Sequence, residues 1–323
     1  MLIKLLRSLL HPGRSDAGPA MPPTSRTQAS PASLEQALAS IAAGLERANH
    51  ALTQGNWLAH QHYQLAGQQY IAALLASPRY DDPARLERSG FKAYSQSDED
   101  GILAEVFRRI GSTNRVFLET GVENGLENNT LYLLHNGWRG CWIECDDQCV
   151  EQIRSGFHEP LADATLKLRH ARVDCANVNA LIAEFGLPRE IDLLSIDIDG
   201  NDYHVWQAIT SIDPRVVVIE YNARFAPPTR WVMPYDAKHV AERNDYFGAS
   251  LSSLANLGEA KGYALVGCNI TGSNAFFVRK DIAHGKFQQP PSAENFYHPA
   301  RYFLTPAFVS GHPPRYGRSA PQA

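Results

Sequence analysis

Four short apolar segments constrain the fold of this 323-residue chain more than any other feature. They cover residues 116–118, 141–143, 191–198 and 216–219, and helical or turn-forming stretches separate them. Strands that are buried on both faces of a sheet read as continuous apolar runs, and parallel strands need crossover connections between them. The pattern predicts an α/β domain over residues 91–281, with a Rossmann-like and mostly parallel sheet.

The sheet is predicted to end in an antiparallel pair of strands. Residues 263–266 and 275–278 are rich in β-forming side chains, and the turn-forming residues 271–274 connect them. A single core commonly reaches the size of such a domain, so we expect one catalytic domain in this chain.

The segment 33–78, which precedes this domain, is predicted to be a helical arm. Residues 53–56 interrupt it, and residues 57–76 read as a second helix, so the two would form a helical hairpin or an oligomerisation arm. The arm either packs on its own core or makes a homo-oligomer. Its first part has apolar residues four and three positions apart, the spacing of a helix that packs on another helix. These residues are Leu34, Leu38, Ile41, Leu45, Ala48 and Leu52.

Both ends of the chain are predicted to be irregular. Residues 1–32 read as a flexible segment, and residues 282–323 as a Pro-rich, irregular tail. Residues 1–10 are apolar, but Lys4 and Arg7 interrupt them, and the run is too short to span a bilayer. It either frays or makes a weak peripheral contact with a membrane.

Composition excludes some classes of partner. A formal net charge of -4 and a pI near 6.3 give no basic field for nucleic-acid phosphates, so we expect no nucleic-acid partner. The five cysteines fit neither a disulfide framework nor a zinc pattern. Small buried thiols in a reducing compartment are the expected state, which favours a cytoplasmic location.

A glycine turn follows the first predicted strand. Glu119 ends this strand, and Gly121 and Gly125 follow it at a spacing of four residues. Glycines at a strand's carboxyl end let a ligand approach the backbone. Their spacing differs from the Gly-x-Gly-x-x-Gly of dinucleotide sites, which favours S-adenosylmethionine, a cofactor without a pyrophosphate. An ordinary turn is the alternative.

Two further acids stand where this type of fold holds a nucleoside. Glu144 ends the second predicted strand, about twenty residues beyond the glycines, where acids accept hydrogen bonds from ribose hydroxyls. Asp174, in Arg172-Val173-Asp174, follows a further predicted strand that lies between the apolar segments 141–143 and 191–198, in a suitable place for the adenine amino group. A surface turn is the alternative for Asp174.

The densest polar cluster lies in residues 192–202. Burying these acids in the middle of a strand is costly, so we expect all of them at its open end. Asp197 there, with Glu220 and Asn222 after the next strand, would form a site for a hard cation such as Mg²⁺. A hydrogen-bonded polar pocket is the alternative.

Three motifs, of which the first precedes the first predicted strand, together resemble those of the FkbM-type methyltransferases. They are Ser95-Gln96 with Glu99-Asp100, Glu119-Thr120-Gly121 with Gly125, and residues 192–200. The resemblance covers about residues 91–281. It implies a class I methyltransferase fold, S-adenosylmethionine as donor, and methylation of a hydroxyl on a sugar, a glycan precursor or another secondary metabolite.

The resemblance also implies roles for single residues. Glu119, Gly121 and Gly125 would line the methionine portion of the cofactor, Glu144 would bind the ribose, and Asp174 would bind the adenine.

Gln96 and Asp197 match the family pattern as well and belong to the expected cofactor site. Two positions depart from it, because Ser195 stands where family members often have lysine, and Asp199 where they often have glutamate.

The residues that bind the acceptor and the general base are expected near the last parallel strands. Substrate would enter over the long loop after residue 220, and loops of this kind commonly carry specificity. His204 is the expected general base, with Asp199 as an alternative, since an imidazole suits proton removal near neutrality. A structural role is the alternative for His204. The expected acceptor-binding residues, which suit a sugar or an acidic group, are Arg224, Arg230, Trp231 and Tyr235.

Two other functional classes compete with a methyltransferase. Residues 197–199 also form an Asp-x-Asp, which holds a divalent metal and sugar-nucleotide phosphates in glycosyltransferases. The other class is a non-catalytic binding or scaffold protein that keeps the fold. The glycine turn after one strand and the acid after the next favour the methyltransferase.

Overall fold

The computed structural model describes residues 31–242, 244–304 and 316–317. The membrane contact that we expected of residues 1–10 therefore lies outside the described residues, as do residue 243 and most of the expected tail beyond residue 304. Within the described ranges, no helix combines the length and the apolar character that crossing a bilayer requires.

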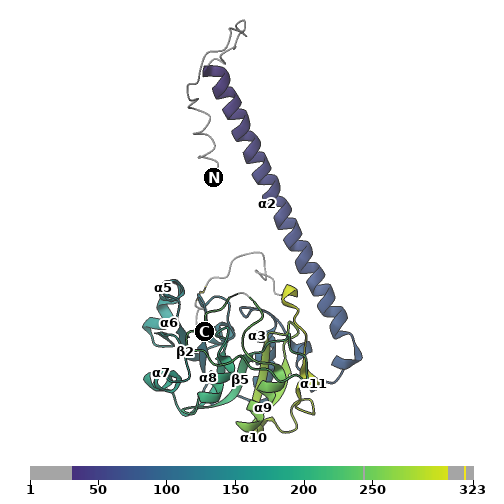
Figure 1. Cartoon of the computed structure of the whole chain (residues 1–323), viewed down its shortest axis with the longest axis vertical. Helices are drawn as coiled ribbons and strands as arrows, with labels where there is room; N and C mark the ends of the chain where they lie inside the picture. The colour runs from purple at the N-terminus through teal and green to yellow at the C-terminus, as the bar shows by residue number, and fades with distance from the viewer. Residues whose placement is uncertain (1–30, 243, 305–315, 318–323) are drawn as a thin grey trace, which may run out of the picture. The chain divides into compact units, whose positions relative to one another are not determined.

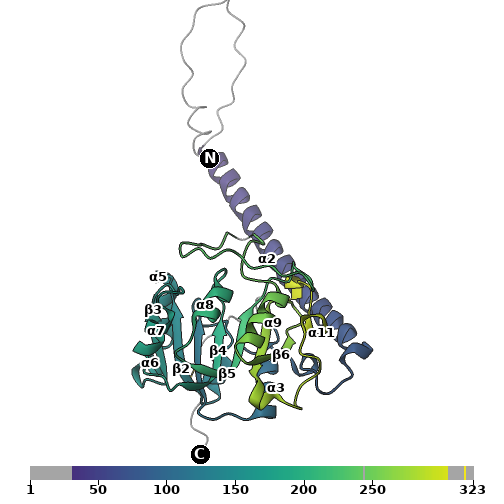
Figure 2. The same ribbon diagram turned by 60° about the horizontal axis from the view of Figure 1, so that its bottom comes forward.

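One sheet of seven strands forms the centre of the chain between residues 116 and 279. Its order is β3-β2-β1-β4-β5-β7-β6, and Figure 2 shows these strands side by side. The strands β1 to β5 pair in parallel, whereas β7 is antiparallel to both β5 and β6. The predicted Rossmann-like sheet with a terminal antiparallel pair is confirmed. The strands are β1 Val116–Thr120, β2 Arg139–Glu144, β3 Leu166–His170, β4 Glu190–Ile196, β5 Asp213–Glu220, β6 Tyr263–Cys268 and β7 Asn274–Arg279.

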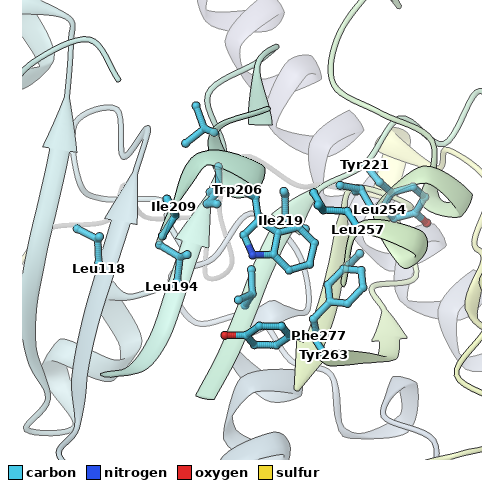
Figure 3. Close-up of a cluster of buried hydrophobic side chains, with 14 of the residues drawn as sticks. Leu118, Leu194, Trp206, Ile209, Ile219, Tyr221, Leu254, Leu257, Tyr263 and Phe277 are labelled. Carbon is cyan, nitrogen blue, oxygen red and sulfur yellow. The ribbon is translucent and has the colours of Figure 1, made fainter. Parts of the chain in front are cut away.

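Helices cover both faces of the sheet, because successive strand residues point to opposite sides. On β4, Leu194 belongs to one apolar cluster and Leu193 to the other. Figure 3 shows the first cluster, in which the rings of Trp206 and Phe277 lie 4.9 Å apart. This face is covered by α7 Val178–Glu184, α8 Asp202–Ala208 and α9 Leu251–Ala260. The other face is covered by α3 Glu99–Ile110, α4 Leu131–His135 and α5 Asp147–Gly156.

Shorter elements complete the described chain. The short α-helices are α6 His158–Ala162, α10 Lys280–Ala283 and α11 Ala293–Phe296. Single 3₁₀ turns are η1 Pro78–Tyr80, η2 Glu87–Ser89 and η3 Tyr302–Leu304.

The predicted arm is one helix, α2 Pro31–Leu75, which Figure 1 shows as continuous. The prediction of a hairpin broken at residues 53–56 is wrong. Gly55 is the strongest breaker in this stretch, and a glycine inside a helix costs only about 1 kcal/mol relative to alanine. No proline occurs after Pro31 within the helix, so every later residue can donate its backbone N–H to the helix.

A buried ion pair holds the amino ends of the central strands. The carboxylate of Asp192 accepts hydrogen bonds from the backbone N–H groups of Thr113, Asn114 and Arg115, and from Arg215 Nη1 at 2.7 Å. These bonds hold the pKa of Asp192 below its ordinary value in spite of burial. The expectation that every acid of residues 192–202 lies at the open end of the strand is wrong for Asp192, because it anchors the segment before β1.

We predict that Asp192→Asn lowers the free energy of unfolding by about 3–5 kcal/mol at pH 7, since it leaves Arg215 buried without its counter-charge. Because the folded pKa is depressed, the stabilisation exists above the unfolded pKa of about 3.9 and is lost as the pH falls through the folded value. Urea titrations at pH 7 and at acid pH measure the difference, which should shrink in acid.

Asp213→Asn is the matched control, because it breaks an exposed ion pair with Arg189. Its cost should stay below about 1 kcal/mol. Equal costs for the two variants would contradict the anchoring role of Asp192.

Candidate active site

A cavity of about 260 Å³ opens at the carboxyl ends of the parallel strands, where the strand order reverses between β1 and β4. Ligands bind at this point in open α/β sheets. The cavity brings together most of the residues that were expected to form the cofactor and metal sites. These are Gln96, Glu119, Gly121, Glu144, Asp197 and Glu220, and Asp199, the alternative base, lines the cavity with them.

Glu144 ties together the loops that follow β1 and β2. Its Oε2 accepts from the backbone N–H groups of Val122 and Glu123 at 3.0 and 2.8 Å. Its Oε1 accepts from those of Cys145 and Asp146 at 2.7 and 2.9 Å. A carboxylate offers about four lone-pair positions, and four backbone groups occupy them here. Glu144 therefore shapes the cavity wall by holding two loops.

Gly121, the first glycine of the turn, allows the backbone at Asp197 to lie against the turn. A Cβ on Gly121, whose φ is +74°, would lie 1.6 Å from the carbonyl oxygen of Asp197. The turn thus lets the loops after β1 and β4 touch. The side chain that Gly121 lacks would collide with the protein itself.

Gly125 packs against side chains of the hydrophobic core. A Cβ at this position would lie 2.7 Å from the Trp142 side chain and 2.9 Å from that of Phe157. Gly125 is absent from the residues that line the cavity. Its bare Cα lets the turn pack on two aromatic rings.

Glu119 is buried and saturated by hydrogen bonds. Its Oε1 accepts from Asn129 N and Ser195 Oγ at 2.9 and 3.0 Å, and its Oε2 from Thr130 Oγ1 at 2.5 Å. Burial raises its pKa to about 7, and these bonds oppose the rise. Ser195, where the resembling family often has lysine, is thus a partner of Glu119.

Three carboxylates converge at the centre of the site, because Asp197, Asp199 and Glu220 each offer an oxygen within 4.8 Å of the others. Burial and mutual repulsion raise the pKa of Asp197 and of Glu220. Among the described residues, Glu220 Oε2 and Asn274 Oδ1 are buried and have no hydrogen-bond partner. Oxygens in this arrangement are suitable ligands for a hard cation.

Asn222 takes no part in this group, although it was expected among the metal ligands. Its Nδ2 donates to the carbonyls of Asp245 and Phe247, and its Oδ1 accepts from Arg224 N. The structure places Asp199 with Asp197 and Glu220 instead. Asn222 holds the start of the loop that follows β5.

Asp174 and His204 lie outside the residues that line the cavity. Asp174 Oδ1 accepts from the N–H groups of Ala176 and Asn177, so this carboxylate shapes the approach to α7. His204 Nε2 lies 2.7 Å from the carbonyl oxygen of Met233. Both side chains have local partners.

A second cavity, of about 400 Å³, adjoins the first. The two share four lining residues: Gln96, Asp199, Glu220 and His239. Sequence reasoning missed His239, because it lies in a loop without a recognisable motif. Its Nε2 is 3.0 Å from the carbonyl oxygen of Asp199. The rest of the second cavity is lined by Ala241, Glu242, Asn244, Tyr246, Phe247, Ser273 and Tyr302.

The four residues that were expected to bind an acceptor are absent from this lining. Arg224 pairs with Asp245 at 2.9 Å. Trp231 stacks on Phe225, with ring centroids 4.3 Å apart. Tyr235 packs edge-on against His204, and Arg230 is exposed.

No family model matches the chain, and no curated protein sequence matches it, so the resemblance to the FkbM-type family is not confirmed. Solved structures with a similar fold include a putative O-methyltransferase from Klebsiella pneumoniae, with 18% identity, 68% of this chain and 96% of that chain covered, and a TM-score of 0.39. Another is the O-methyltransferase from Bacillus cereus in complex with SAH, with 16% identity, coverage of 67% and 89%, and a TM-score of 0.36. At this level of similarity no function transfers to the chain.

We predict that Gly121→Ala lowers the free energy of unfolding roughly 1–3 kcal/mol more than Gly111→Ala does. Both glycines have a positive φ, and an alanine there costs about 1–3 kcal/mol by conformation alone. Only at Gly121 does the new Cβ also meet backbone, because the space around Gly111 is open. Urea denaturation measures both losses. Equal losses, with cofactor binding impaired only in Gly121→Ala, would show instead that the glycine makes room for a ligand.

Proposed function

We propose that the chain is an S-adenosylmethionine-dependent methyltransferase that methylates a hydroxyl group. One observation carries the proposal: the cavity at the strand ends is rich in acids, and Arg172 is its only Lys or Arg among the described residues. The donor carries a sulfonium and an ammonium against one carboxylate, so its net charge is positive. Dinucleotides and nucleoside diphosphates are anionic. The acids are Glu119, Glu123, Glu127, Glu144, Asp197, Asp199 and Glu220.

The donor would lie across the carboxyl ends of β1, β2 and β4. Its methionine end would approach Asp197 and the turn at Gly121, because an unpaired carboxylate there complements the ammonium. Its adenine would lie against residues 171–173, which line the far side of the cavity. Glu144 would support this arrangement by holding the two loops. It would not bind the ribose itself, because the ribose hydroxyls would have to displace its backbone donors.

The methyl group would transfer where the two cavities meet. The acceptor oxygen attacks the sulfonium methyl in line, the carbon–sulfur bond breaks, and S-adenosylhomocysteine leaves as a neutral thioether. Holding the two reacting atoms in line supplies most of the acceleration. Asp199 and Glu220 line both cavities and would orient the acceptor hydroxyl at this junction.

His239 is the proposed general base. A carbonyl oxygen only accepts hydrogen bonds, so the contact with Asp199 requires a hydrogen on Nε2. In the neutral ring this leaves Nδ1 unprotonated, and Nδ1 would accept the proton of the acceptor hydroxyl.

The described lining of the second cavity favours an acceptor that carries no carboxylate, because Asp199, Glu220 and Glu242 line it and like charges repel. Tyr246 and Tyr302 add aromatic faces of the kind on which sugar rings pack. Of the two acceptor classes expected from the sequence, a sugar fits this surface better than an acidic group.

A second candidate is a metal-dependent glycosyltransferase, and the three converging carboxylates of Asp197, Asp199 and Glu220 favour it. A divalent cation held by them would bridge to a diphosphate. In a methyltransferase, the same ion would instead lower the pKa of the acceptor hydroxyl. The acid-rich cavity favours the methyltransferase, since a sugar nucleotide would have to enter against its charge.

We predict that S-adenosylhomocysteine binds to the purified chain without added metal, and that a nucleoside diphosphate with Mg²⁺ does not. Asp197→Asn should weaken that binding roughly ten- to a hundredfold, the value of a charged hydrogen bond of about 1.5–3 kcal/mol. Isothermal calorimetry with each ligand, and with Mg²⁺ alone, measures this. Glu151→Gln, on the exposed side of α5, is the control. Tight binding of the diphosphate alone would favour the glycosyltransferase.

We predict that His239→Gln lowers kcat for methyl transfer about 10²- to 10⁴-fold, the usual contribution of a general base, and changes S-adenosylhomocysteine affinity only slightly. His204→Gln is the matched control and should leave kcat nearly unchanged, because His204 has a structural partner in Met233. Transfer of label from the donor to acceptors in a cell extract, at equal enzyme concentration, compares the methyl-transfer rates of the variants. The opposite ranking of the two variants would restore His204 as the base.

A further inference from the structure

The first part of α2 carries large apolar side chains that are exposed to solvent. Ile41, Leu45 and Leu52 expose 59%, 67% and 66% of their surface. Soluble proteins rarely leave a contiguous apolar stripe of this kind uncovered. The proposed chemistry makes no use of this part of the helix.

The spacing of the stripe identifies the kind of element that covers it. The apolar positions alternate by four and three residues, which is the heptad pattern of a helix packed on another helix. In heptad terms, Leu38, Leu45 and Leu52 occupy a positions, and Ile41 and Ala48 occupy d positions. The repeat is broken only at Gly55, which lies at the next d position.

The residues that flank the stripe indicate that the partner is identical. The e and g positions of a coiled coil choose the partner through their charges. From residue 41 to residue 58 these positions hold no charged side chain. Two copies of the helix can therefore pair without charge repulsion, and no charge at these positions favours a partner of different sequence. The positions hold Ala42, Gly44, Asn49, Ala51, Asn56 and Leu58.

The distribution of charge argues against a membrane surface as the covering element. Helices that lie in a membrane interface carry many Lys and Arg residues on the polar face. Between residues 38 and 59 the polar face offers one basic residue, Arg47, next to the acidic Glu46. Such a face gives little attraction to anionic lipid.

We infer that residues 41–59 of α2 are a self-association surface, on which the a and d side chains pack against the same seam of a second copy of this chain. In a symmetric pair the same residues face each other from both copies, so each substitution in the seam acts twice. The inference does not rest on the proposed methyl transfer.

The test is the mass of the full-length protein in solution, measured by light scattering after gel filtration and by sedimentation velocity. We expect at least twice the chain mass of 35.8 kDa at micromolar concentration. Leu45→Ala with Leu52→Ala should raise the dissociation constant at least a hundredfold. Alanine favours helix, so these substitutions remove the seam and preserve α2. Leu45→Glu with Leu52→Glu should give the mass of one chain.

Ala43→Glu with His50→Glu is the matched control. These residues occupy f positions, seven residues apart like the two leucines, and should leave the mass unchanged. Helix content by circular dichroism and S-adenosylhomocysteine binding should be the same in the alanine variant and the wild type. A wild-type mass of one chain would overturn the inference, as would assembly that survives both leucine pairs or that the f-position pair disrupts equally.

Discussion

The crowding of carboxylates at one edge of the sheet is the constraint on which the arrangement of the site depends. Buried acids cost free energy unless donors or cations satisfy them. Glu144 is satisfied by four backbone N–H groups, and Glu119 by Asn129, Thr130 and Ser195. The loop geometry at the open end of the sheet follows from these bonds. The turns after β1 and β2 are held where they are because they supply the donors.

Asp202 extends the same principle to the loop after β4. Its two carboxylate oxygens accept from the N–H groups of Ile198 and Gly200 at 2.8 and 2.9 Å. The loop is thereby folded over the end of the strand, and the side chains of Asp197 and Asp199 are brought near Glu220. Of the described acids that line the cavity, Glu220 keeps a buried oxygen, Oε2, without a hydrogen-bond partner. Burial and the neighbouring carboxylates raise the pKa of Asp197 and of Glu220. Groups with perturbed pKa values in a cleft are candidates for a functional site.

Several features of the protein followed from its sequence alone. The apolar runs predicted four of the parallel strands, because a strand buried on both faces needs apolar side chains throughout. The acids and glycines that follow those runs had to lie at the carboxyl edge, since all parallel strands end there. The alternating spacing of four and three residues along Ile41, Leu45, Ala48 and Leu52 likewise indicated a helix with an apolar stripe. Each of these inferences depends on neighbours along the chain, and such patterns are legible in a sequence.

The tertiary structure alone decided which polar groups are available for chemistry. Glu119 and Glu144 looked like free ligands in the sequence, yet segments up to 76 residues away supply their partners. Gly121 makes room for the carbonyl of Asp197, and Asp192 turned out to anchor the opposite end of β4. His239 reaches the site by a loop, whereas His204 is held by Met233. The reason is physical: whether a polar atom is free depends on donors and acceptors that folding brings to it from distant segments, and no local pattern encodes them.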